Sequence, residues 1–167
     1  MKKELTGILY RDMTEVLFVG IGNVLRRDDG AGVYIVSQIK AQGRFSKLLV
    51  EVSIENYLGK INSINPDIVI IVDCVDFNQK PGFTGLVPIE QIKEFDVSSH
   101  NISLRRVADH LKMEVHVIGI QPSDLRVGEN LTPEVKASSD EIVSLLNELI
   151  SQHIEQTSTY SNEDIQY

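Results

Sequence analysis

Four short runs of apolar residues predict buried β-strands in this chain. They cover Val16–Ile21, 47–52, 67–72 and Glu114–Ile120. In the third run, residues 69–72 are apolar at successive positions rather than at alternate ones. This pattern is typical of a strand that is covered on both faces, as in a parallel sheet between two layers of helices.

Helical patterns fall between these strands. Apolar residues recur at helical spacing over 29–41 and 101–111, and a weaker helix is predicted over 55–64. A last helix is predicted to begin at Thr132-Pro133-Glu134, since threonine is a good N-cap and proline is tolerated in the first turn. A fifth strand is predicted over 84–89, directly after a Pro-Gly turn signal.

The alternation of strands and helices predicts an α/β fold, a three-layer α/β/α sandwich with a mostly parallel central sheet. In such sheets, binding sites collect outside the carboxyl ends of the strands. We predict a single domain over residues 1–167 with its core at about 16–152. Residues 1–14 and 155–167 are expected to be flexible ends, because neither segment carries a clear apolar pattern.

Composition and charge exclude several classes of partner. The formal net charge is −8, the isoelectric point is near 5.0, and no basic cluster is longer than a pair. Nucleic acid and membranes are therefore not expected partners. The apolar runs fall short of the ~18 residues of a membrane helix, and the start of the chain lacks a signal-peptide core. With a single cysteine and hence no internal disulfide, we expect a cytoplasmic protein.

The segment after the first strand carries the first candidate site residues. Gly22 and Asn23 tolerate the positive φ angles of a tight turn, and Asp28 and Asp29 stand where the next helix should begin. Helix capping explains both carboxylates equally well. The two glycines before Asn23 also resemble the opening of a dinucleotide-binding fingerprint. Leu25 replaces its third glycine, however, and two carboxylates would repel a pyrophosphate.

Two further candidates follow other predicted strands. Asp73 ends the third apolar run, and His100 enters a predicted helix behind two serines that already suffice as N-caps. Taken singly, Asp73 has turn capping as a possible but not compelling alternative role, and a lone histidine at a helix start, such as His100, is more often structural or solvent-facing than a ligand. Together with Asp29 they are expected at one edge of the sheet, where two carboxylates and an imidazole form a common ligand set for a divalent metal. Such a metal can polarise a carbonyl or activate a bound water.

The remaining nucleophiles and histidines are weaker candidates. Cys74 lies in an apolar run, where a free cysteine is usually a small core residue rather than a nucleophile. His116 is expected to be packed within its strand, and His110 and His153 are expected to be exposed on helices. A Gly-x-Ser-x-Gly elbow of a serine hydrolase does not occur in the sequence.

Four groups of motifs occur in order along residues 16–150. They are Gly20-Ile21-Gly22-Asn23-Val24-Leu25 with Asp28-Asp29-Gly30-Ala31-Gly32-Val33, Ile70-Ile71-Val72-Asp73-Cys74-Val75 with Pro81-Gly82, Ser99-His100-Asn101-Ile102-Ser103-Leu104, and Val117-Ile118-Gly119-Ile120-Gln121-Pro122 with Gly128-Glu129-Asn130-Leu131-Thr132-Pro133-Glu134-Val135. This set resembles the hydrogenase maturation endopeptidases, which remove a C-terminal extension from the nickel-bearing large subunit. The resemblance implies a phosphorylase/hydrolase-like fold and metal ligands at Asp29, Asp73 and His100. Some members of that family carry glutamate where this chain has Asp29.

The resemblance further implies a metal-dependent endopeptidase that processes the nickel–iron hydrogenase large-subunit precursor after nickel insertion. The nickel is expected to arrive with the precursor, and other divalent cations are expected to fit the same ligands. The precursor complex is expected to be transient and the enzyme monomeric, with Gly22, Asn23 and Asp28 lining the substrate groove. A non-catalytic nickel-sensing or precursor-holding factor would use the same ligands, so the sequence leaves that alternative open.

Overall fold

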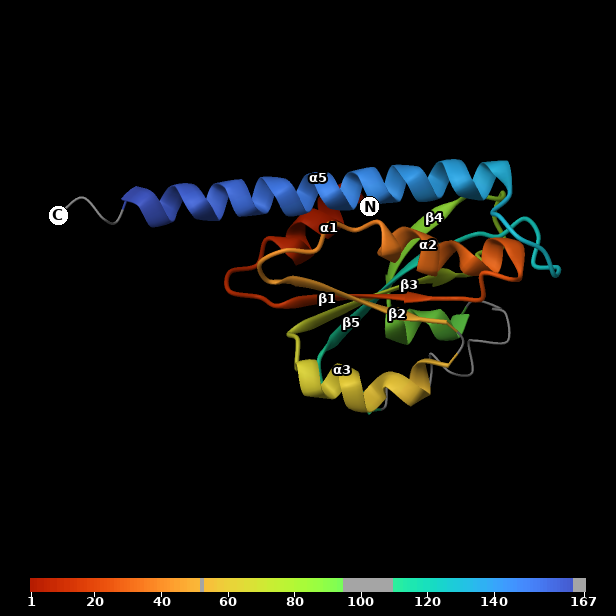
Figure 1. Ribbon diagram of the computed structural model, residues 1–167, viewed down its shortest axis with the longest axis horizontal. Coiled ribbons are helices and arrows are strands. Elements are labelled where there is room, and N and C mark those ends of the chain that lie inside the picture. Colours follow the sequence, from red (N-terminus) through yellow and green to blue (C-terminus); the bar gives the residue numbers. More distant parts are fainter. Residues whose placement is uncertain (52, 95–109, 164–167) are drawn as a thin grey trace.

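A five-stranded sheet forms the centre of the protein, in the order β2-β1-β3-β5-β4 (Figure 1). This computed structural model describes the backbone of residues 1–51, 53–94 and 110–163. Four strands run parallel, namely β1 (Val16–Ile21), β2 (Phe45–Val50), β3 (Ile68–Cys74) and β5 (Glu114–Ile120). The fifth, β4 (Thr84–Pro88), pairs antiparallel with β5 at one edge. The predicted mostly parallel sheet is confirmed, with β1 and β5 at their predicted bounds.

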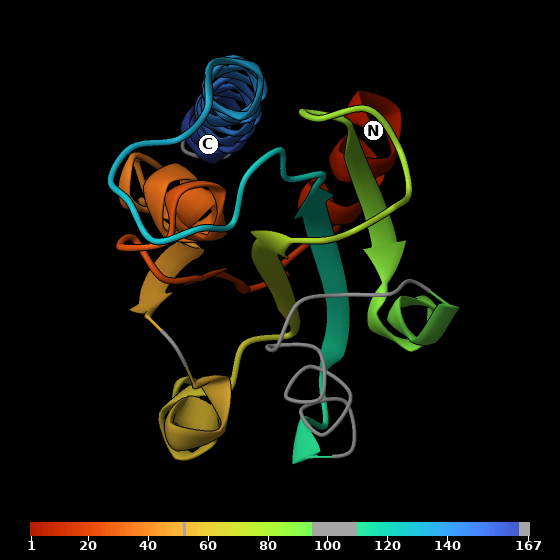
Figure 2. The ribbon, with the colours of Figure 1, turned by 90° about the vertical axis from the view of Figure 1, so that its right-hand side faces the viewer.

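Helices cover both faces of this sheet, as Figures 1 and 2 show. One face carries α1 (Lys2–Leu9), α2 (Ala31–Ser37) and α5 (Pro133–Glu163). The other face carries α3 (Leu58–Ile64) and the short 3-10 helices η2 (Ile54–Tyr57) and η3 (Ile89–Glu94). Every residue of β1 and β3 is buried, because alternate side chains enter the two apolar layers. The predicted three-layer architecture is therefore confirmed.

The start of α2 is packed against the backbone at the carboxyl ends of β1 and β3. A Cβ atom on Gly32 would lie 2.1 Å from the Val72 carbonyl oxygen, so only glycine permits this approach. The 3-10 turn η1 (Arg27–Gly30) precedes the helix and is held in the same place. The predicted 29–41 helix is thus shorter than expected, since its first residues form this tighter turn.

The last helix begins at Pro133 as predicted, but its end differs from the expectation. The helix continues to Glu163 and runs the length of the sheet and past it (Figure 1), whereas residues from 155 onward were expected to fray. Extending a formed helix costs little, and the polar residues of this segment are compatible with it. The predicted helix at 101–111 lies almost wholly outside the described residues. In the described part of the chain, no helix combines the length and the apolar character needed to cross a bilayer.

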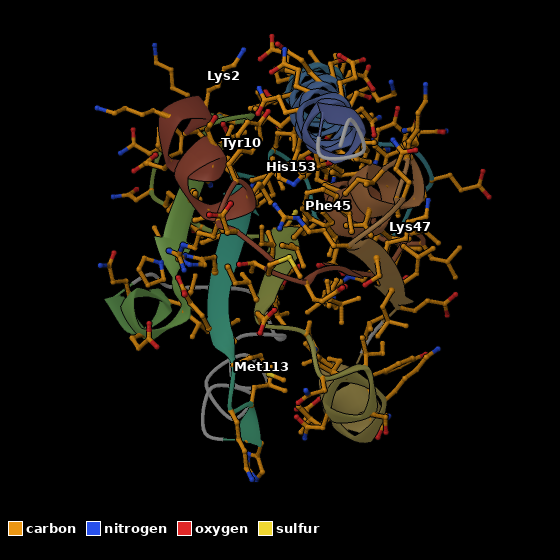
Figure 3. The ribbon with its side chains drawn as sticks, turned by 90° about the vertical axis from the view of Figure 1, so that its left-hand side faces the viewer. Lys2, Tyr10, Phe45, Lys47, Met113 and His153 are labelled. Carbon is orange, nitrogen blue, oxygen red and sulfur yellow. The ribbon has the colours of Figure 1, made fainter. Side chains whose placement is uncertain are left out.

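His153 is buried rather than exposed, which corrects the expectation from sequence. Its side chain on α5 is 7% exposed and lies between the rings of Tyr10 and Phe45, with centroid distances of 5.1 and 5.6 Å (Figure 3). The Arg44 guanidinium lies 3.3 Å from its Nδ1 atom. Burial and, secondly, this neighbouring cation lower the pKa of His153. His153 is therefore a packed residue near the amino ends of the strands.

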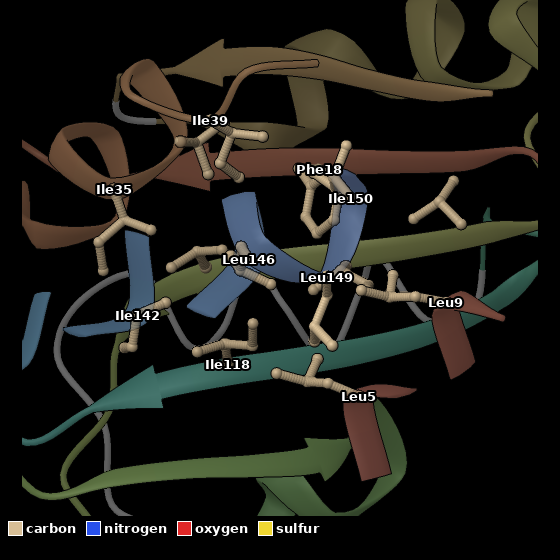
Figure 4. Packing of buried hydrophobic residues seen from close by; sticks show 14 of the residues in the cluster. Leu5, Leu9, Phe18, Ile35, Ile39, Ile118, Ile142, Leu146, Leu149 and Ile150 are labelled. Carbon is tan, nitrogen blue, oxygen red and sulfur yellow. The ribbon is translucent and has the colours of Figure 1, made fainter. Parts of the chain in front are cut away.

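The N-terminal segment is part of the core, although it was expected to be a flexible lead-in. Leu5 and Leu9 of α1 are fully buried and lie in one cluster with Leu149 of α5 (Figure 4). The Tyr10 hydroxyl donates to the Leu149 carbonyl at 3.1 Å and anchors the end of α1. An eight-residue helix shows too few apolar positions for a periodic pattern to be recognised, so the sequence did not reveal its contact with α5.

Because Leu9 is fully buried in the core cluster that α1 shares with α5, Leu9→Ala should destabilise the whole domain. A buried leucine truncated to alanine costs about 2–5 kcal/mol, as lost burial and as a cavity. Urea unfolding followed by far-UV circular dichroism measures this loss, with the exposed Lys3→Ala as the control on the same helix. Equal unfolding midpoints for the two variants would contradict the assignment of α1 to the core.

Candidate active site

The carboxylate of Asp28 holds together the two loops at the carboxyl end of the sheet. Its side chain is fully buried in η1. Oδ2 accepts the backbone N–H groups of Ser123 and Asp124, each at 2.9 Å, and the Thr132 hydroxyl at 2.9 Å. Oδ1 accepts the Thr132 N–H at 2.7 Å. Four donors from one loop therefore converge on a single side chain.

This geometry gives Asp28 a structural task and gives no support to its predicted place in the substrate groove. A fully buried carboxylate with four donors presents no surface to a substrate. It is not a helix cap either, since the cap of η1 at Arg26 makes no side-chain bond and the donors to Asp28 come from residues 123–132. A direct contact between Asp28 and substrate stays a prediction.

Asp29 is held beside the first turn by the glycine that leaves β1. Gly22 has a φ of +141°, and a Cβ atom there would lie 1.8 Å from the Asp29 carbonyl oxygen. Asn23 shapes the same turn, because its Oδ1 atom accepts the Leu25 N–H at 2.9 Å. These contacts bring the Asp29 backbone against the end of β1, and its side chain is 2% exposed. The structure thus gives Gly22 and Asn23 turn-forming roles, and their predicted contact with substrate is untested.

Asp73 and Cys74 end the central strand β3 next to this turn. The Asp73 side chain is fully buried, and its Oδ1 atom accepts the Cys74 N–H at 2.8 Å. The Cys74 thiol donates to the Asp28 carbonyl oxygen at 2.6 Å, which ties β3 to η1. Burial raises the pKa of the Cys74 thiol well above its ordinary value, and the negative charges of Asp73, Asp29 and Asp28 add to this effect.

Two of the three predicted metal ligands lie on elements, η1 and β3, that the Cys74–Asp28 hydrogen bond joins. Asp29 and Asp73 come from different elements, yet both act electrostatically on the Cys74 thiol. The third, His100, lies outside the described residues. Within the described ranges, no three His, Cys, Asp or Glu side chains form a group able to hold a metal ion. Asp29 and Asp73 are both buried, and carboxylate oxygens are suitable donors to a divalent cation that finds further ligands elsewhere.

Gln121 is a structural residue of the site that the sequence did not single out. It is buried directly after β5, and its Oε1 atom accepts the N–H groups of Phe77 at 2.7 Å and Gln79 at 3.2 Å. Its Nε2 atom donates to Asp76 at 3.0 Å. Gln121 therefore fixes the turn that follows the Asp73 strand. Its position directly after a buried run was the available signal, since polar residues there lie at the sheet edge that carries sites.

The similarity of this chain to known proteins agrees with the arrangement. A sequence model of the family described as HycI, hydrogenase maturation protease, matches residues 33–149. The chain belongs to this family. It is a hydrogenase maturation endopeptidase, a hydrolase that processes a hydrogenase precursor.

Solved structures and a further relative extend the similarity over most of the chain. The crystal structure of a [NiFe] hydrogenase maturation protease, HycI, from Thermococcus kodakarensis is 25% identical with a TM-score of 0.74, covering 89% of this chain and 99% of that one. The solution structure of the endopeptidase HycI from Escherichia coli is 26% identical with a TM-score of 0.70, covering 81% and 90%. The hydrogenase expression/formation protein HupD of Thiocapsa roseopersicina is 25% identical, covering 85% of this chain and 70% of that one.

Membership of this family resolves the alternative that the sequence left open. Proteins of the family are proteases, so the chain is an enzyme rather than a precursor-holding factor. The resemblance in sequence motifs is confirmed. Which residues carry the chemistry is a separate matter, because neither the family match nor the fold assigns a role to any single side chain.

Replacing Asp28 by alanine should loosen the loop that its carboxylate gathers. Three backbone N–H groups and one hydroxyl would lose their acceptor, and we expect stability to fall by more than about 2 kcal/mol. Native-state hydrogen exchange should show faster exchange at Ser123, Asp124 and Thr132. The exposed Glu129→Ala on the same loop serves as the control. Unchanged exchange at those three amides would contradict the role of Asp28.

Cys74 should be chemically inert in the folded protein. Its thiol is buried, donates to a carbonyl and lies among three carboxylates, so the thiolate that reacts with alkylating agents is disfavoured. Iodoacetamide at about pH 8 should leave the native protein unmodified and should label it fully after unfolding in guanidinium, as read by mass spectrometry. Rapid labelling of the native protein would instead point to a reactive cysteine.

Proposed function

We propose that this enzyme removes the C-terminal extension of the nickel–iron hydrogenase large-subunit precursor after nickel has been inserted. The metal belongs to the substrate and is presented to Asp29, Asp73 and His100. The observation that carries this proposal is the burial of two carboxylates, Asp29 in η1 and Asp73 near the end of β3, on two elements that the Cys74–Asp28 hydrogen bond joins.

The burial of these two carboxylates favours a cation as their partner. Holding carboxylates away from water costs free energy, and a divalent cation offsets that cost. Carboxylate oxygens and one imidazole supply three ligands, so positions remain for groups of the precursor. This incomplete set supports recognition of a metal that arrives with its own ligands.

The reaction is the hydrolysis of one peptide bond. A water oxygen adds to the scissile carbonyl carbon, the carbon–nitrogen bond breaks, and the leaving amine takes up a proton. A divalent metal held by Asp29, Asp73 and His100 would polarise the carbonyl. The protein holds Asp29 and Asp73 in fixed positions for this reaction. The Asp73 carboxylate accepts a hydrogen bond from the Cys74 N–H, and the Asp29 backbone carbonyl lies against Gly22.

The need for substrate-borne nickel makes cleavage a checkpoint. Three protein ligands hold a metal weakly until the precursor completes the coordination, so a precursor without nickel lacks the group that the acids recognise. The sequence expectation of a transient complex and a monomeric enzyme belongs to this proposal.

Asp29→Asn, Asp73→Asn and His100→Ala should each lower the rate of precursor processing by more than about 100-fold, because each removes a ligand. The measurement is the mass of the nickel-loaded precursor before and after incubation with enzyme. Matched controls are the exposed Asp12→Asn and the exposed His110→Ala, which should retain normal rates. Wild-type rates in both Asp29→Asn and His100→Ala would rule out the proposed ligand set.

A further inference from the structure

Two loops at the carboxyl end of the sheet are joined into one rigid ridge. The two-loop ridge comprises residues 23–27 and 124–131. Arg27 N–H donates to the Gly128 carbonyl and Gly128 N–H donates to the Leu25 carbonyl, each at 2.9 Å. The Arg26 Nε atom donates to the Leu125 carbonyl at 3.2 Å. Figure 2 shows the second loop running past α2 to reach α5.

The two-loop ridge holds apolar side chains out in water. Val24 is 50% exposed, Leu25 61% and Val127 85%. Of the seven large apolar side chains that are exposed in the described part of the chain, these three share one ridge and the others are dispersed over different elements. Single exposed apolar residues are ordinary, but a group of them on a preorganised surface is typical of a binding site.

The ridge also carries positive charge on an acidic protein. The ridge contains three arginines, Arg26, Arg27 and Arg126, and two acids, Asp124 and Glu129. The whole chain, in contrast, has a formal net charge of −8. Asp124 is shared, since Arg126 binds both of its oxygens and the Arg27 Nε atom lies 3.4 Å from Oδ2. One carboxylate thus faces two guanidinium groups, so the ridge favours an acidic partner.

A pocket of about 220 Å³ opens between the two-loop ridge and the starts of α2 and α5. Val24, Leu131 and Tyr34 give it apolar walls, and Arg27 and Lys136 are the charged residues that line it in the described part of the chain. The Lys136 ammonium lies 4.9 Å from the centre of the Tyr34 ring, and Asp140 accepts from both side chains. These contacts hold the Tyr34 and Lys136 side chains in place. The pocket therefore suits an apolar side chain with a carboxylate beside it.

We propose that the two-loop ridge and this pocket are the docking surface for the hydrogenase precursor, through a segment of its chain that carries an apolar side chain next to a carboxylate. The surface is continuous with the candidate active site, because Asp28 and Asp29 directly follow Arg27 and Gly30 lines the pocket. This inference rests on the proposed function, yet it concerns binding of the precursor and not its cleavage.

The test is the affinity of the nickel-loaded precursor for the immobilised full-length enzyme, with the rate of processing measured separately. Leu25→Ser combined with Val127→Ser should raise Kd by at least about tenfold and should raise KM while leaving kcat within about twofold. Arg26→Glu should also raise Kd, and the wild-type Kd should rise with salt. Because the Leu25 and Val127 side chains are exposed, the thermal midpoint of the double variant should not change.

The matched control is Ile64→Ser, which removes a 43% exposed apolar side chain at the end of α3 on the opposite face. A Kd for the double variant equal to that of Ile64→Ser would overturn the docking proposal, as would an absence of precursor binding by the wild type. Self-association of the wild type that the double variant abolishes, at unchanged precursor affinity, would assign the ridge to a second copy of this chain. Binding without cleavage would overturn the proposed function alone.

Discussion

The organisation of the site depends on one buried carboxylate, that of Asp28. A charged group away from water is tolerated only when donors surround it, and the 123–132 loop supplies four. The four hydrogen bonds to the Asp28 carboxylate therefore fix the loop between the end of β5 and the start of α5. The same residue accepts the Cys74 thiol through its backbone carbonyl, so β3 is connected to the same point. Two strands, a turn and a long helix acquire fixed relative positions through it.

Glycines make this connection possible by letting backbones meet. Gly32 lies against the Val72 carbonyl, and Gly22 lies against the Asp29 carbonyl. A side chain at either position would push η1 and α2 away from the ends of β1 and β3. Asp29 and Asp73 would then lose the relative positions that the packing of η1 against β3 gives them. The glycines in the first motif are thus explained by packing, without any phosphate ligand.

Much of the fold could be predicted from the sequence because its central strands are buried on both faces. Successive apolar residues in β3 and the Thr132-Pro133 start of α5 are local signals, and each led to the right element. The failures have a different cause. Leu5 and Leu9 are buried only because α5 lies above them, and His153 is buried only because Tyr10 and Phe45 flank it. A local pattern does not identify which distant segment of the chain will cover a residue.

The positions of Asp29 and Asp73 at the carboxyl end of the sheet could be predicted, since the ends of parallel strands share one edge, while their role as ligands stays a prediction. Position after a strand did not separate Asp28, whose carboxylate points to the 123–132 loop, from its neighbour Asp29. Adjacent acids look alike in a sequence, and only the donors around each one distinguish a structural carboxylate from a candidate ligand.

The two proposals together explain how a protease avoids cutting or retaining the wrong form of its substrate. A docking surface strong enough to act alone would hold nickel-free precursor as well as the loaded form, and the enzyme would be sequestered. A surface with three exposed apolar side chains and a small pocket gives only moderate affinity, and an incomplete ligand set gives only moderate affinity for a metal. Asp28 connects the two-loop ridge rigidly to the proposed metal ligands. Binding of the precursor at one of these two places therefore favours its binding at the other. The metal contact then distinguishes the nickel-loaded precursor from the nickel-free one, whereas the two-loop ridge contributes the same binding free energy to both.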